Sequence, residues 1–364
     1  MSKLADAYYE IGYKVDNSGL MKADKGLKKI GKSALGAEDD VSKLSKVLDF
    51  TETGLVSVGA IIGTLAYGIN KATNEFALFD DQLRKVNAKG DMTTKSYEKL
   101  KKAAFDAGKD TRFTATESAK GLEYMAMAGW SATESVKALP ASLNMAVVAG
   151  EDLALVTDIM TDQMTVFDLG ADKANHFADV LAYSANKANT SIGQMGETLK
   201  FAGAPAKALG ADVEEVSALI MSMADGGVKG SQAGTALRTA YLNLASPTKE
   251  AQRTIRKLKL ETKDSNGNFV GMTNILDQLG TKTREMTNIQ KAQVFQTLFG
   301  KEAITGMMVV QAQGTKKLKE NTKALKNNND YAKKAADYMN SNLKGTLAGT
   351  TSKQEALRLA IGET

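Results

Sequence analysis

The chain of 364 residues contains no cysteine and a single histidine, His176. The absence of cysteine excludes disulfides and thiolate metal sites, and a lone imidazole excludes in practice a zinc site built on histidine. Only 3 prolines and 6% aromatic residues accompany many Ala, Lys, Leu, Met and Gly residues. This composition is typical of an all-helical protein whose core is built from small and flexible side chains. The net charge of +5 does not by itself indicate nucleic-acid binding.

The stretch 189–238 predicts three helices that pack closely together. Ser191 with Gln194, and Asp212 with Glu215, have the spacing of a capping box, in which two side chains satisfy free N–H groups at a helix start. Gly203-Ala204-Pro205 and Gly226-Gly227-Val228-Lys229-Gly230 predict turns between the helices. Capping-box spacings also occur at Thr114/Glu117, Ser131/Glu134 and Thr287/Gln290.

We predict an all-α fold, with a multi-helix core of short, glycine-separated helices, one small β-hairpin and extended helical arms on both sides. The core is expected over residues 76–313, with the hairpin at about 259–271 turning at Asp264–Asn268. YMAMAGWSATESVKAL and LIMSMADGGVKGSQAGTAL are similar enough to form a candidate pseudo-repeat. The segment 314–364 is rich in lysine and is predicted to be a helical arm that leaves the core.

The N-terminal arm, residues 1–75, contains a possible short strand at Ala7–Asp16, a charged helix at Leu20–Phe50 and an uncharged run at Thr53–Asn70. As a helix, this run spans about 27 Å, slightly less than the roughly 30 Å of a bilayer core. Gly59 and Gly63 form a GxxxG pair, which lets two helices approach closely. The run is either a membrane-inserting segment or a packed Gly-rich helix. Its Gly, Ser and Thr residues favour the packed helix.

The sequence contains no catalytic motif that would indicate an enzyme. A catalytic triad would have to use His176, and no GxSxG motif is present. Residues 227–234 lack the spacing of a phosphate-binding loop, and Asp264–Asn268 lacks the glycine position of a calcium loop. We therefore expect neither a cofactor nor a bound metal.

Several long blocks of the chain resemble the core region of phage tail tape measure proteins. The resemblance covers about residues 76–314, and the family core block includes Gly196, Gly203, Gly227, Gly230 and Gly234. It continues more loosely to the last residue. The blocks that carry it are TRFTATESAKGLEYMAMAGWSATES, FADVLAYSANKANTS, GETLKFAGAPAKALG, VSALIMSMADGGVKGSQAGTALR and TLFGKEAITGMM.

The resemblance implies a structural protein that acts as the ruler of tail length and the scaffold of tail-tube assembly, with a role in genome ejection. It implies binding to the tail tube protein, tail assembly chaperones and tail-tip or baseplate proteins, and a place in the tail-tube lumen of the virion after assembly in the host cytoplasm. Self-association is a further expectation, and sequence-specific nucleic-acid binding is not expected. The alternative is a membrane-active helical protein that forms part of a DNA-entry conduit in the host envelope.

Family members normally continue far beyond the length of this chain. Fully helical, its 364 residues would span roughly 550 Å at about 1.5 Å each. The resemblance therefore implies an N-terminal fragment or a truncated gene product.

Overall fold

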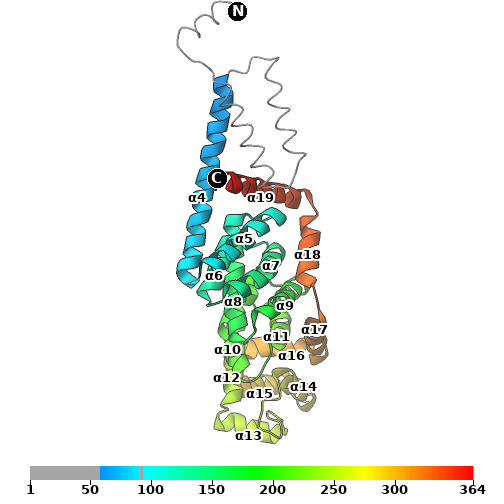
Figure 1. Ribbon diagram of the computed structural model, residues 1–364. Coiled ribbons are helices and arrows are strands. Elements are labelled where there is room, and N and C mark those ends of the chain that lie inside the picture. The colour runs from blue at the N-terminus through cyan, green and yellow to red at the C-terminus, as the bar shows by residue number, and fades with distance from the viewer. Residues whose placement is uncertain (1–57, 91–92, 364) are drawn as a thin grey trace, which may run out of the picture. The chain divides into compact units, whose positions relative to one another are not determined.

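The computed structural model describes residues 58–90 and 93–363, which are almost entirely helical (Figure 1). This confirms the predicted all-α class. The chain divides into two compact units, one of residues 81–352 and one that joins residues 1–80 to 353–364. The strand predicted at Ala7–Asp16 and the helix predicted at Leu20–Phe50 lie outside the described residues.

Most of the helices are 10–20 residues long, and α4 is longer. Their order along the chain is α4 (Val58–Gly90), α5 (Thr94–Asp110), α6 (Ala115–Met127), α7 (Ala132–Ala149), α8 (Leu153–Val166), the 3-10 helix η2 (Ala171–Lys173), α9 (Ala174–Lys187), α10 (Ile192–Ala208), α11 (Val213–Asp225), α12 (Gly230–Ala245), α13 (Lys249–Leu258), α14 (Met272–Lys282), α15 (Asn288–Phe299), α16 (Ile304–Gln313), α17 (Thr315–Asn327), α18 (Tyr331–Asn340) and α19 (Leu343–Gly362).

Within residues 81–352, the helices form two rows that run side by side (Figure 1). The helices α6, α8, α10 and α12 follow one another in one row, and α7, α9 and α11 follow one another in the other. Short turns join the rows, so this unit is a stack of helical hairpins. The helices α13 to α16 gather at the end of the stack opposite α5. Because each hairpin mainly contacts its neighbours, the core extends along the stack, as in helical-repeat proteins.

Four of the turns between stacked helices share one backbone geometry. In each, a residue with positive φ follows the helix: Gly129, Asp168, Gly210 or Gly227. The next residue donates its N–H to a carbonyl five residues earlier, which satisfies a free helix-end acceptor. The turns of the candidate pseudo-repeat thus belong to a series of four within the two rows, and the same geometry recurs after α13, where Lys259 has positive φ and Leu260 donates to Ile255. The donors and acceptors are Trp130 to Met125, Leu169 to Met164, Ala211 to Ala206 and Val228 to Met223.

The predicted helix starts are set by side-chain caps. Complete capping boxes form at Thr114, Ser131, Ser191 and Thr287, as their spacing predicts. At α11 only half of the box forms. Asp212 accepts the N–H of Glu215, but the Glu215 carboxylate accepts the N–H of Thr273 from the start of α14 instead. A local capping pattern has here become a long-range contact.

The predicted β-hairpin is wrong. Among the described residues its place is taken by a single antiparallel bridge between Lys263 and Phe269. The Asp264 carboxylate closes the turn by accepting the N–H groups of Asn266 and Asn268. Between α13 and α14, five residues precede the turn and three follow it, and an isolated hairpin of two such short strands is marginally stable at best.

The turn predicted at Gly203-Ala204-Pro205 is also wrong. The helix α10 continues through these residues to Ala208, with the proline in its last turn. The glycine at this position serves close packing, because a Cβ on Gly203 would lie 3.0 Å from Gln163 Oε1 and 3.1 Å from Val166 Cγ1. Further along the chain, Ser246 ends α12 and Thr248, after Pro247, caps α13.

The second unit is described at residues 58–80 of α4 and 353–363 of α19. Ala72 and Phe79 from α4, and Ala356 and Leu359 from α19, are buried. Arg358 forms an ion pair with Glu75. These contacts join two segments that lie far apart in the sequence.

The lysine-rich segment does not leave the core as an arm. We refer to α17 and α18, residues 315–340, as the return segment, because it runs back along the stack: α17 packs on α11 and α14, and α18 packs on α7 and α9. The acids that pair with its lysines come from distant parts of the sequence, which is why they could not be foreseen. The pairs are Lys317 with Asp225, Lys319 with Asp277 and Lys326 with Asp212.

One buried carboxylate holds the start of α18. Asp179, in α9, is 4% exposed and accepts the N–H groups of Asp330 and Ala332, both at 2.8 Å. Burial raises the pKa of Asp179, and the two N–H groups oppose that shift. The lysine pairs of α17 are about half exposed, so each contributes only about 0–1 kcal/mol. Asp179 is therefore the strongest polar attachment of the return segment.

We expect Asp179→Ala to release α18 from the stack, because it leaves the buried N–H of Ala332 and the partly buried N–H of Asp330 without an acceptor. The free energy of unfolding should fall by about 1–3 kcal/mol. Amide hydrogen exchange should accelerate in residues 331–340 before it does in α10 or α12. The matched control is Asp337→Ala on the same helix, which removes an exposed pair with Lys333 and should cost less than about 0.5 kcal/mol. Equal effects of the two substitutions would contradict the assigned role of Asp179.

Candidate functional site

The predicted glycines of the family core block lie on two sides of α10. Gly196 and Gly203 are two turns apart and face α8. A Cβ on Gly196 would lie 2.7 Å from Ile159, closer than any normal contact. The helix therefore uses two glycines to approach α8.

On its other side, α10 meets α12 through Gly230 and Gly234. A Cβ on Gly234 would lie 2.9 Å from the carbonyl oxygen of Thr198 and 2.9 Å from the Cβ of Phe201. The Thr198 hydroxyl donates to the carbonyl of Gly230 at 3.0 Å. The two helices therefore pack backbone to backbone, with a buried hydrogen bond across the crossing.

The other singled-out glycines lie elsewhere. Gly227 has φ +86° in the turn before α12, with no atom within 4 Å of a Cβ placed there. Gly59 and Gly63 lie in α4, and residues 53–57 of the apolar run lie outside the described residues. No helix in the described part of the chain has an apolar stretch long enough to cross a membrane.

Gly234→Ala should destabilise the protein by about 1–3 kcal/mol, because the added methyl group meets a backbone carbonyl that cannot move without separating the helices. Gly349→Ala is the matched control, since a Cβ there has no atom within 4 Å in helix α19. That control should be neutral or stabilising by up to about 1 kcal/mol, because alanine favours helix. Chemical denaturation measures both. A neutral Gly234→Ala variant would contradict the close crossing.

His176, the only histidine of the chain, pairs with an acid across the second row. Its Nε2 lies 2.6 Å from Glu214 Oε1, which joins α9 to the start of α11. The hydrogen bond to Glu214 raises the pKa of His176, against an opposing effect of burial. Burial acts to raise the pKa of Glu214, but the hydrogen bond from His176, a backbone hydrogen bond and the nearby charges of His176 and Lys326 together lower it. Each of the two side chains therefore serves as the structural partner of the other.

This pair predicts a defined pH dependence. Because the folded pKa of His176 is raised, its stabilisation is fully present below the ordinary value of 6.5 and is lost as the pH rises through the folded pKa. His176→Gln should abolish this pH-dependent loss of stability. The free energy of unfolding between about pH 6 and 8 measures it. Glu214→Gln should lower the imidazole NMR midpoint, whereas Glu285→Gln, an exposed acid elsewhere, should not. An unchanged midpoint in Glu214→Gln would contradict the pairing.

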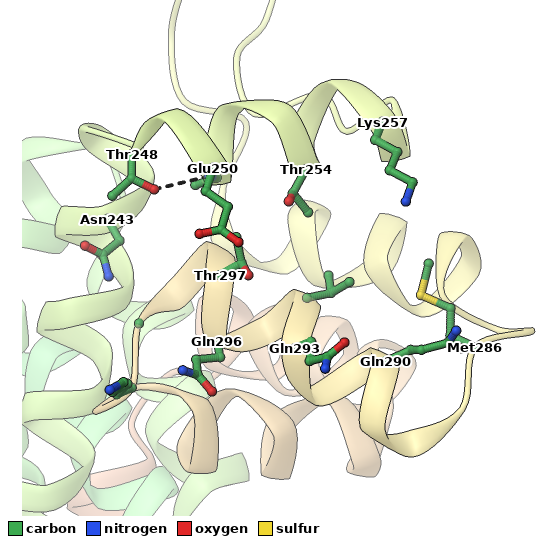
Figure 2. Close-up of a pocket in the computed structure, with 14 residues that line it drawn as sticks. Asn243, Thr248, Glu250, Thr254, Lys257, Met286, Gln290, Gln293, Gln296 and Thr297 are labelled. Atoms are coloured by element: carbon green, nitrogen blue, oxygen red, sulfur yellow. Dashed lines mark hydrogen bonds between the residues drawn. The ribbon is translucent and has the colours of Figure 1, made fainter.

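A polar groove lies between α13 and α15 at one end of the stack (Figure 2). Its volume is 790 Å³. Thr254 and Lys257 line it from α13, and Gln293 and Gln296 line it from α15. Neither glutamine side chain has a hydrogen-bond partner among the described residues, so their amides are available to a ligand.

A basic stripe borders the groove. Lys249, Arg253, Arg256 and Lys257 follow one another at helical spacing on α13, and all four are exposed. None of them forms an ion pair with a described residue. Ala251 is buried on the opposite side of the helix. The spacing in KEAQRTIRKL could have revealed this stripe from the sequence, but it was not singled out.

A metal centre is not indicated: no group of three or more His, Cys, Asp or Glu residues in the described ranges could hold an ion. What the geometry provides is closely packed helices and a concave polar surface. Both are features of a structural or interaction protein.

Comparison with known proteins agrees with this conclusion. The profile of the family described as phage-related minor tail protein matches residues 101–300. The tape measure protein of Pneumococcus phage Dp-1 is 36% identical over 273 residues, which cover 75% of this chain and 24% of that protein. The probable tape measure protein of Escherichia phage P2 is 29% identical over 261 residues, which cover 71% of this chain and 32% of that protein. The aligned part is thus about a quarter to a third of these relatives. No solved structure matches the chain.

Proposed function

This chain belongs to the phage-related minor tail protein family, among the tape measure proteins, and we propose that it serves as the ruler of tail length and scaffold of tail-tube assembly. The observation that carries the proposal is the family match, which spans residues 101–300 and thus most of the helical stack. The two relatives named above carry the printed name of tape measure proteins, and their similarity extends over most of this chain.

Within such a ruler, residues 81–352 form a folded unit and not a uniformly extended rod. The two rows bring residues far apart in sequence together, as in the contact of α18 with α7. Residues 81–352 therefore contribute less length than a single helix of the same number of residues would. We infer that this unit serves attachment or assembly, and that length is measured by extended segments.

The partners that fit this role are the tail tube protein, tail assembly chaperones and tail-tip or baseplate proteins. The site of action is the tail-tube lumen of the virion, after assembly in the host cytoplasm. A role in genome ejection is part of the same proposal, since a protein in the lumen has to leave before DNA passes.

Tail length should follow the length of the gene. In the phage that encodes this chain, an in-frame insertion of about 70 helical residues after Gly362 should lengthen the tail by about 105 Å, at about 1.5 Å per residue. An insertion of half that length should give half the change, which serves as the internal control. Electron microscopy of purified virions measures both. Normal tails of unchanged length would contradict the ruler role.

The alternative of a membrane-active conduit rests on the sequence of residues 53–70 and on the lysine-rich segment 314–364. Liposome flotation of the chain and of the Gly59→Leu, Gly63→Leu variant tests it. Flotation of either protein would favour the conduit, and absence of both from the lipid fraction would exclude it.

A further inference from the structure

We propose that the groove between α13 and α15 binds an extended, acidic peptide segment of a partner protein. The proposal concerns a surface that the packing of the stack does not use. It goes beyond the measurement of tail length and does not depend on it.

The dimensions of the groove suit a short extended peptide. The helices α13 and α15 have 10 and 12 residues, which correspond to about 15 and 18 Å. At about 3.3 Å per residue, a groove of this length accommodates roughly five residues of an extended chain. The volume of 790 Å³ lies in the range of ligand-binding clefts, about 300–1,000 Å³.

The lining suits the backbone of such a peptide. The exposed amides of Gln293 and Gln296 each offer a donor and an acceptor, and the hydroxyls of Thr254 and Thr297 offer both as well. A peptide backbone presents alternating N–H and C=O groups, which these side chains can match without a fixed sequence. Met286 and Val294 supply limited apolar contact in the same groove.

The charges select an acidic peptide. Lys257 and Lys301 line the groove against one acid, Glu250. Figure 2 shows Glu250 and Lys257 at different positions along α13, so the Lys257 end is the basic one. Arg253 and Arg256 lie beside that end and have no acidic partner among the described residues. An acidic side chain bound there would form charge-assisted hydrogen bonds with these cations, which have none to an acid of the described residues.

A peptide fits this surface better than a nucleic acid. Single-stranded nucleic acid is bound by aromatic side chains that stack on bases, and no aromatic residue lines the groove. Duplex DNA could contact the basic stripe through its phosphates, but it would leave the glutamine-lined groove unused. The groove and the stripe together therefore favour the peptide.

Fluorescence anisotropy with the full chain tests the proposal at about 0.15 M salt. Labelled hexaglutamate is the probe for peptide binding. A labelled short duplex DNA, measured separately, tests the alternative of nucleic-acid binding. The double substitution Arg253→Glu, Lys257→Glu should weaken hexaglutamate binding by at least about tenfold. Lys120→Glu, Lys137→Glu is the control with the same charge change on two exposed lysines of α6 and α7. It should have a much smaller effect.

A second pair of variants separates the groove from the stripe. Gln293→Leu changes no charge and should weaken peptide binding several-fold, whereas Gln232→Leu, at an exposed position of α12, should not. The proposal is overturned if hexaglutamate does not bind. It is also overturned if Gln293→Leu leaves hexaglutamate binding intact and the DNA binds as tightly as hexaglutamate. The basic stripe would then bind any polyanion, without a contribution from the groove. Circular dichroism of each variant confirms that the fold is retained.

Discussion

The close crossing of α10 with α12 is the contact on which the stack depends. Gly234 lets the backbone carbonyl of Thr198 approach, and the hydroxyl of Thr198 then reaches the carbonyl of Gly230. On the other side of α10, Gly196 and Gly203 allow α8 to approach as closely. One helix thus packs closely on both neighbours of its row. In a core with few aromatic residues, this close backbone approach takes the place of large interlocking side chains.

The local features of the fold could be predicted, because their causes lie within a few residues. Four capping boxes occur where Ser or Thr precedes Glu or Gln by three positions. The glycine turn at Gly227 follows from the need for positive φ. Gly203 was misread because glycine has two uses, a turn and a close approach, and only the position of α8 distinguishes them. The prediction of a hairpin was wrong for a similar reason, since the neighbouring helices determine how many residues remain for strands.

The position of the return segment could not be predicted, because its partners are distant in sequence. The lysines of α17 look like a solvated face when only their own segment is considered. In the structure, acids of α11 and α14 pair with three of them, and Leu318 and Leu325 are fully buried. Asp179 lies more than 150 residues from the N–H groups that it accepts. A single sequence contains no signal for such a pairing.

Charge pairing also explains why α13 differs from α17. Both helices are basic and both are amphipathic, but three lysines of α17 pair with acids at or within α11 and α14, whereas the basic stripe of α13 forms no ion pair with a described residue. Its packing against α15, with Ala251 buried, accounts for the position of α13 but not for the four cations on its outer face. Unpaired like charges on one helix repel each other and weaken it. The repulsion among these four cations destabilises α13, and the folding of the chain gives no reason for it. An acidic partner that binds the stripe and the groove beside it explains it better.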